Sequence, residues 1–210
     1  MFKKEDLRKF DLFSDVEYSS ISKFCTISYY SKGSIVFYYG DKSERISFLV
    51  SGSCSHLVES RDNIINIFAS LPGDMLGDIE NFNCDSVYYD STVSTVSDSI
   101  ILEIDFYEFK KIFDNKMLIS FLNLINIKNK KLKESINILL MDSMSKICYL
   151  IDNKIDYLNE NKHFKIANSV GISPETMSRI IKKLIISKII KKVNNKIIVI
   201  DCDKLKKYYS

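Results

Sequence analysis

The sequence contains few residues of the types that interrupt helices and strands, form disulfides or bind metal ions. Its 210 residues include 2 prolines, 6 glycines, 2 histidines, 5 cysteines and no tryptophan. Five scattered cysteines indicate reduced, mostly buried thiols and argue against disulfides or a zinc site. Two histidines more than 100 positions apart exclude the convergent histidine and carboxylate set that a metal-dependent barrel enzyme needs. We therefore expect no metal site and no enzyme activity.

Long apolar runs are also missing. No run approaches the roughly 18 residues that span a bilayer, and residues 1–6 are not followed by the apolar core of a secretion signal. We expect a cytoplasmic protein without membrane segments. With 46% hydrophobic and 27% charged residues, the composition suits one large or two small globular domains.

The net charge of +3 conceals an uneven distribution. Residues 1–115 contain 11 Lys and Arg against 19 Asp and Glu, a net charge of −8. Residues 116–210 contain 19 Lys and Arg against 8 Asp and Glu, a net charge of +11. An acidic half followed by a basic half favours a regulatory module joined to one that binds a polyanion. A solvated, lysine-rich surface would produce the same counts.

The first half has the pattern of antiparallel β structure. Short β-branched and aromatic runs at residues 34–39, 46–50 and 64–68 alternate with turns. Five of the six glycines fall in this half, at turn positions that need a positive φ. The spacing predicts an antiparallel barrel or sandwich, with a short helix before it within 15–24 and another after it over 106–113.

A long helix is predicted where the two halves meet. Between residues 117 and 140 a mostly apolar seam repeats at alternating steps of four and three, which is a coiled-coil register. Its members are Leu118, Leu122, Ile125, Asn129, Leu132, Ile136 and Leu139. One Asn in such a seam favours two parallel helices, because the amide is satisfied by its counterpart, and we predict a homodimer. The alternative is an amphipathic helix packed on its own domain with Asn129 exposed. Four further apolar residues support partial packing of that kind: Phe121, Leu124, Ile127 and Ile138.

Residues 163–184 have the spacing of a helix-turn-helix. The small Ala167 lets two helices approach, and Gly171 supplies the turn between them. The second helix has Ser173 as its N-cap and Pro174 at its first position. Its outward positions are Glu175, Ser178, Arg179 and Lys182. Arg donates to guanine, Glu accepts from cytosine and Ser reaches bases, so we predict base reading by Glu175, Ser178 and Arg179.

A hairpin wing is predicted after this motif. Residues 189–200 contain two β-rich runs around Asn194 and Asn195, a pair that tolerates the positive φ of a tight turn. Beside a helix-turn-helix in a basic segment, lysines and hydroxyls indicate phosphate contacts with double-stranded DNA. The predicted phosphate contacts are Ser173, Thr176, Lys182, Lys191, Lys192 and Lys196.

The sequence resembles the superfamily of the catabolite activator protein and the fumarate and nitrate reductase regulator (CRP/FNR). The matching residues are Leu12-Phe13-Ser14, Ser31-Lys32-Gly33, Gly40-Asp41, residues 48–52, Gly73-Asp74, Gly77-Asp78 and residues 171–179. The resemblance implies an α+β fold: an N-terminal antiparallel, cyclic-nucleotide-binding-like β-roll, a long dimerisation helix and a C-terminal winged helix-turn-helix. It also implies a dimeric transcriptional regulator that reads an inverted-repeat operator. Glu175, Ser178 and Arg179 match the FNR branch, which implies a half-site nearer TTGAT than GTGA.

The effector position departs from that of cyclic-AMP-binding relatives, which use a Gly-Glu pair for the ribose and an Arg for the phosphate. Here the pair is Gly77-Asp78, and residues 87–92 contain no cation. The implied effector pocket comprises Gly77, Asp78, Tyr89, Asp90 and Ser91. We predict no physiological cyclic-nucleotide binding, because Asp90 would repel the phosphate. No cysteine precedes Cys25, which excludes the N-terminal iron–sulfur cluster of oxygen-sensing relatives.

We therefore predict a β-roll effector domain at residues 1–115, a dimerisation helix at 116–141 and a winged helix-turn-helix at 142–210. The expected partners are double-stranded DNA, a second copy of the chain, an unidentified small-molecule effector and, for an activator, RNA polymerase. No cofactor is predicted. Two alternatives stay open: a sensor that acts through protein contacts, and a haem-based gas sensor that uses His56 or His163.

Overall fold

The computed structural model describes residues 3–60, 63–79, 82–84 and 86–209. The chain divides into two compact units, each with its own hydrophobic core. The first comprises Met1–Val58 and Ile67–Leu132, and the second comprises Glu59–Asn66 and Lys133–Ser210. Within the described ranges, no helix is long and apolar enough to cross a membrane.

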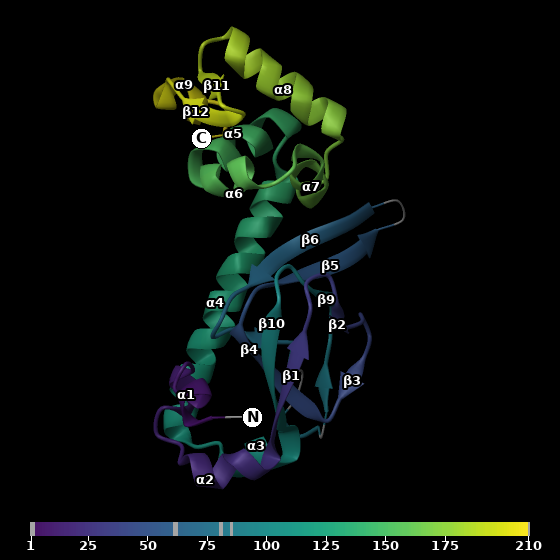
Figure 1. Ribbon diagram of the computed structural model, residues 1–210, viewed down its shortest axis with the longest axis vertical. Helices are drawn as coiled ribbons and strands as arrows, with labels where there is room; N and C mark the ends of the chain where they lie inside the picture. The colour runs from purple at the N-terminus through teal and green to yellow at the C-terminus, as the bar shows by residue number, and fades with distance from the viewer. Residues whose placement is uncertain (1–2, 61–62, 80–81, 85, 210) are drawn as a thin grey trace. The chain divides into compact units, whose positions relative to one another are not determined.

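The strands between residues 25 and 105 build an antiparallel β-roll (Figure 1). One sheet has the order β1-β10-β4-β7, the other has the order β2-β9-β5-β6, and β3 pairs with β8. The bounds are β1 Cys25–Tyr30, β2 Ile35–Phe37, β3 Lys42–Ser43, β4 Arg45–Ser51, β5 Cys54–Ser60, β6 Asn63–Ser70, β7 Met75–Leu76, β8 Val87–Tyr88, β9 Thr92–Thr95 and β10 Ser99–Asp105. The prediction of antiparallel β structure in the first half is confirmed.

Strand β4 shows why an uninterrupted apolar run forms a strand here. Side chains alternate between the two faces of a sheet, and both faces of β4 are covered. Phe48 and Val50 lie in the main core, whereas Leu49 lies in a second cluster with Leu76 and Ile101. The main core is aromatic: Phe48 packs edge-on against Phe13 of the N-terminal segment, with ring centroids 5.3 Å apart.

Short helical elements flank the roll. They are α1 Lys4–Leu7, the 3-10 turn η1 Asp11–Phe13, α2 Tyr18–Ile21, the 3-10 turn η2 Ser22–Phe24 and α3 Phe106–Ile112. The helices predicted within 15–24 and over 106–113 are therefore present, the first as α2 continued by η2. Asp105 caps α3, since its carboxylate accepts a hydrogen bond from the backbone N–H of Glu108 at 3.0 Å.

The long helix α4, Asn115–Leu140, has 26 residues, as the seam predicted. Its apolar residues divide between two roles. Met117 and Phe121 are buried in the roll core, with Leu124 and Ile125 packed at the edge of that core. In the seam, Leu118, Leu122 and Ile136 are 41, 52 and 51% exposed. Asn129 is exposed, and Ile125, Leu132 and Leu139 are half-buried. The helix thus packs partly on its own domain and keeps an apolar stripe uncovered.

The second unit is a helix-turn-helix followed by a wing (Figure 1). Its elements are α5 Ser143–Asn153, α6 Ile155–Glu160, α7 His163–Ser169, α8 Pro174–Ile186, β11 Ile190–Val193, β12 Lys196–Val199 and α9 Cys202–Lys206. Ala167 of α7 and Met177 of α8 are buried in one core, and Gly171 turns the chain with a φ of 66°. Asn194 and Asn195 make the wing turn with φ of 48° and 65°. The α+β fold class is confirmed, whereas the boundaries at 115 and 141 stay predictions.

Candidate DNA interface and effector site

Helix α8 begins where the sequence predicts. The Oγ of Ser173 accepts a hydrogen bond from the backbone N–H of Thr176 at 3.1 Å, and Pro174 occupies the first turn. At the preceding turn, the N–H of Ile172 donates to the carbonyl of Ala167 at 3.0 Å. These contacts determine the direction in which α8 leaves α7 and which side of α8 faces outward.

The outward side of α8 carries the three predicted base-reading residues. Glu175, Ser178 and Arg179 are exposed, because the opposite side of the helix is buried in the core of the second unit. That buried side consists of Met177, Ile180, Ile181 and Leu184. Arg179 forms no ion pair with any residue of the described ranges. Its guanidinium is therefore available to a ligand with paired acceptors, such as the edge of guanine.

The predicted phosphate contacts differ in availability. The Ser173 hydroxyl is used as the helix cap and also donates to the Thr176 hydroxyl at 3.1 Å. The lysines predicted for phosphate contact are all exposed, and none forms an ion pair within the part of the chain that the structure describes. They are Lys182 on α8 and Lys191, Lys192 and Lys196 on the wing. Unpaired lysines on one small domain provide the positive surface that binding to DNA requires.

Asn159 on α6 holds the wing and was not singled out from the sequence. Its Oδ1 accepts from the backbone N–H of Ile197 at 2.7 Å, and its Nδ2 donates to the carbonyl of Ile197 at 3.1 Å. Ile197 lies on β12 opposite Lys192. One side-chain amide therefore satisfies both outward backbone groups of a wing residue, which fixes the strand that carries the lysines. The two residues are 38 positions apart, so no local pattern indicates the contact.

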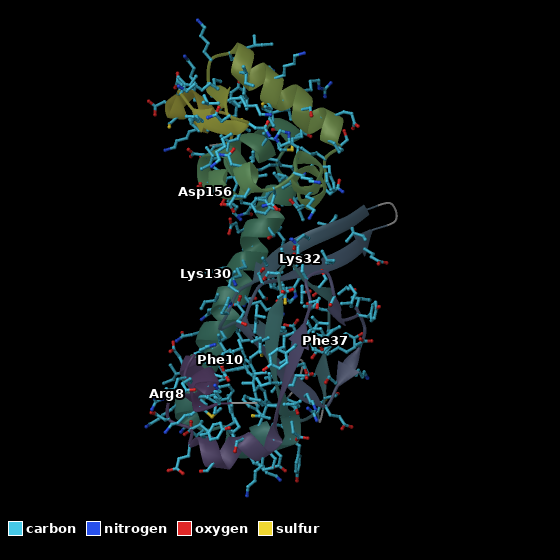
Figure 2. The ribbon with its side chains drawn as sticks, viewed as in Figure 1. Arg8, Phe10, Lys32, Phe37, Lys130 and Asp156 are labelled. Atoms are coloured by element: carbon cyan, nitrogen blue, oxygen red, sulfur yellow. The ribbon has the colours of Figure 1, made fainter. Side chains whose placement is uncertain are left out.

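The residues predicted for the effector pocket meet in the roll, but Tyr89 is part of its core. Tyr89 is 1% exposed and stacks on Phe37, with ring centroids 3.8 Å apart (Phe37 is labelled in Figure 2). Gly77 has a φ of 87°, and a Cβ there would lie 2.4 Å from the Tyr89 ring. Glycine is therefore required for both the backbone conformation and the close approach. Ser91 is buried and Asp90 is exposed.

His56 on β5 is buried beside this position, with both ring nitrogens engaged. Its Nδ1 lies 3.0 Å from the Ser91 hydroxyl and its Nε2 lies 2.8 Å from the Ser70 hydroxyl. The ring stacks on Phe68 with centroids 4.0 Å apart. Because neither nitrogen is free, His56 does not support ligation of haem iron.

The pKa of His56 is lowered to about 3, chiefly by burial. The ammonium groups of Lys128 and Lys131 contribute to this lowering, and Asp90 opposes it. At neutral pH the imidazole is therefore uncharged. Within the described ranges, no group of three or more His, Cys, Asp and Glu side chains is arranged to hold a metal ion.

Two lysines of α4 form ion pairs with the roll that the sequence did not indicate, and one of them, Lys128, reaches the predicted effector position. The Nζ of Lys128 forms an ion pair with Asp78 and donates to the carbonyl of Gly77 at 3.3 Å. One turn later, the Nζ of Lys131 lies 2.5 Å from Oδ2 of Asp74. The cavity that these two lysines share with residues of β6, β7 and α4 has a volume of about 10 Å³, enough for one water at most.

The pKa of the Asp78 carboxyl is raised above its usual value. Burial is the main cause, the nearby Asp90 carboxylate adds to it, and the ion pair with Lys128 opposes both. Lys128 is therefore the cation that favours the ionised form of Asp78. The pairs Lys128–Asp78 and Lys131–Asp74 join residues 50 and 57 positions apart.

Two family models match the chain, one for each unit. The cyclic nucleotide-binding domain family matches residues 27–116, and the Crp-like helix-turn-helix domain family matches residues 161–208. No curated protein sequence matches the chain.

Several solved structures share the fold. A variant of CooA from Carboxydothermus hydrogenoformans has 18% identity and a TM-score of 0.72, over 100% of this chain and 98% of that chain. FixK2 from Bradyrhizobium japonicum has 14% identity and a TM-score of 0.65, over 89% of this chain and 98% of that chain. The c-di-GMP-responsive global regulator CLP of Xanthomonas campestris has 16% identity and a TM-score of 0.65, over 87% of this chain and 99% of that chain.

A cyclic-nucleotide-binding-type roll together with a Crp-like helix-turn-helix defines a DNA-binding transcriptional regulator. A cyclic nucleotide-binding domain and a Crp-like helix-turn-helix in one chain support the CRP/FNR superfamily for this protein. The family resemblance of the sequence is confirmed, whereas its placement in the FNR branch is not tested by these matches.

The buried His56 predicts a pH dependence of stability. Its pKa is about 6.5 when the chain is unfolded and about 3 when it is folded. Between these values the unfolded state binds more protons, so the free energy of unfolding falls as the pH falls from about 6.5. The substitution His56→Gln removes this titration, and we expect a flatter dependence between about pH 6.5 and 5. Urea unfolding of the wild type and His56→Gln across this pH range measures the free energy of unfolding. Equal slopes of this free energy against pH would contradict the lowered pKa of His56.

Proposed function

We propose that the protein is a homodimeric regulator that reads an inverted-repeat operator through α8. The observation that carries this is the free outward side of a capped helix, where Glu175, Ser178 and Arg179 are exposed beside unpaired wing lysines. Arg179 would donate two hydrogen bonds to guanine, Glu175 would accept from cytosine, and Ser178 would reach a base. In a dimer the two helices enter successive major grooves about 34 Å apart.

The base-reading set supports a half-site of the TTGAT type. Glu175, Ser178 and Arg179 match the FNR branch of the superfamily, and Pro174 replaces the additional base-contacting Arg of the catabolite activator protein. The lysines of α8 and the wing would bind phosphates on either side of the bases read by α8. Acting as an activator, the regulator would also contact RNA polymerase.

The dimer would form through the uncovered stripe of α4. Leu118, Leu122 and Ile136 are about half exposed in the single chain, at positions that recur with the coiled-coil register. A second copy of α4 covers such a stripe by the same residues, and it also brings Asn129 opposite its counterpart. Members of the superfamily are dimers, which supports this arrangement.

We also propose that the roll does not bind cyclic nucleotides. The described residues 87–92 provide no cation for the phosphate, and Asp78 is already paired with Lys128. Asp90 is exposed in the same segment and carries the wrong charge. The small-molecule effector, if the roll takes one, would then be of another chemical class.

Substitution Arg179→Ala tests base reading. We expect it to weaken binding to the selected operator by about 1–3 kcal/mol with little effect on random duplex, because Arg179 reads a base. Lys192→Ala is the matched control: it should weaken both duplexes alike and lower the salt slope by about one. The operator is first selected from random DNA, and affinities come from fluorescence anisotropy in a salt series. If Arg179→Ala lost equal affinity for both duplexes, base reading by Arg179 would be contradicted.

Substitution Leu122→Glu tests the dimer seam. It places a charge in the proposed interface, so we expect a dimer in the wild type and a folded monomer in the variant at micromolar concentration. Ile127→Glu is the control, because Ile127 is 45% exposed on the same helix but outside the seam. Sedimentation velocity distinguishes the monomer from the dimer. A monomeric wild type, or dissociation by the control alone, would remove the dimer from the proposal.

Calorimetry tests the exclusion of cyclic nucleotides. We expect neither cyclic AMP nor cyclic GMP to bind the wild type with a dissociation constant below about 10 μM, which corresponds to about 7 kcal/mol. Without an unpaired cation for the phosphate, desolvation of the anion is not offset. Tighter binding of either nucleotide would show that the roll holds the phosphate by another route.

A further inference from the structure

Lys128 occupies a binding site for an ammonium group inside the roll. Its side chain is 12% exposed, and three groups of different kinds surround its Nζ. The carboxylate of Asp78 pairs with it, the carbonyl of Gly77 accepts a hydrogen bond at 3.3 Å, and the ring centroid of Phe68 lies 5.8 Å away. A carboxylate, a carbonyl and an aromatic face are the groups that recognise a primary ammonium.

The site depends on a cation for its own stability. Oδ2 of Asp78 is buried and accepts no hydrogen bond from any residue in the described ranges. Asp90 adds negative charge beside it, and the neighbouring His56 is neutral. Burying a carboxylate without a partner costs free energy, so removal of the ammonium leaves Asp78 without the positive charge that offsets this cost.

A second lysine on the same side of α4 also forms an ion pair with the roll. Lys131, three residues after Lys128, lies 2.5 Å from Asp74, whose Oδ2 also accepts from the backbone N–H of Leu71 at 2.7 Å. Residues three apart lie on one helix face. The two pairs therefore attach that face of α4 to the loops before and after β7, and no diffusible molecule is needed for the attachment.

We propose that the ammonium of Lys128 is an internal ligand of the roll. It takes the place of a small-molecule effector and holds α4 in the position in which the regulator binds its operator. This inference rests on the proposed DNA-binding function. It predicts that operator binding of the wild type needs no added effector, and that shortening Lys128 turns the roll into a receptor for a free alkylammonium ion.

Chemical rescue of Lys128→Ala is the test. The substitution removes three methylene carbons and the ammonium, which together correspond to n-propylammonium. We expect operator affinity to fall about tenfold, within the range of site-to-site coupling in proteins, and n-propylammonium to restore most of it saturably. Tetramethylammonium at equal ionic strength carries the charge without N–H donors and should not restore it. Lys130→Ala, an exposed lysine on the same helix (Figure 2), should stay within twofold of wild type and ignore the amine.

Two further measurements distinguish failure of the internal ligand from failure of the proposed DNA-binding function. Asp78→Asn keeps the side-chain size, and we expect it to lose operator affinity to a similar extent without any response to the amine. The thermal unfolding midpoint of Lys128→Ala should rise with n-propylammonium concentration by mass action, and this readout does not involve DNA. If the wild type binds no operator while the midpoint still rises, the proposed function fails and the internal ligand stands. Wild-type operator affinity in Lys128→Ala or Asp78→Asn, or an amine effect shared by Lys130→Ala, would overturn the internal ligand.

Discussion

The long helix α4 must bury one side against its own roll while it keeps another side apolar and uncovered. A helix of this length is stabilised chiefly by packing of its apolar face, not by its intrinsic propensity. Met117 and Phe121 provide that packing in the roll core. The ion pairs of Lys128 and Lys131 continue the attachment along α4 towards Leu132, where the first unit ends. Because this side packs on the roll, a second copy of the chain would have to cover exposed residues of another side, such as Leu118, Leu122 and Ile136.

The uneven charge of the sequence has different structural uses in the two units. In the roll, lysines from α4 are matched with aspartates, and the pairs are partly buried. In the helix-turn-helix unit, the cations of α8 and the wing are exposed and unpaired among the described residues. The same residue type therefore serves attachment in one unit and, in the proposed function, polyanion binding in the other. The net charge of each half indicated a difference between the units but did not identify which lysines are paired.

Local signals account for what the sequence predicted correctly. Gly171, the Ser173-Pro174 cap and the Asn194-Asn195 turn act through neighbouring residues, so their geometry could be predicted directly. The Asn159 clamp on Ile197 and the Lys128 pair with Asp78 join residues far apart in the sequence. A lysine in an amphipathic helix is usually solvated, and only the folded roll shows that a carboxylate faces it. The position of Tyr89 in the segment predicts an effector-pocket residue, whereas its ring is packed in the core.

These contacts limit the kind of effector that could regulate the protein. A ligand shifts a conformational equilibrium only by its difference in affinity for the two states. An effector that entered beside Asp78 would have to displace the Lys128 ammonium, and it would then face two carboxylates, Asp78 and Asp90, with one cation fewer. An anion is disfavoured in that environment by charge and by desolvation, whereas a cation that replaces the ammonium restores the pair. As an internal ligand, Lys128 would exclude a cyclic phosphate by filling the site, and shortening this one side chain would make the site available to an amine.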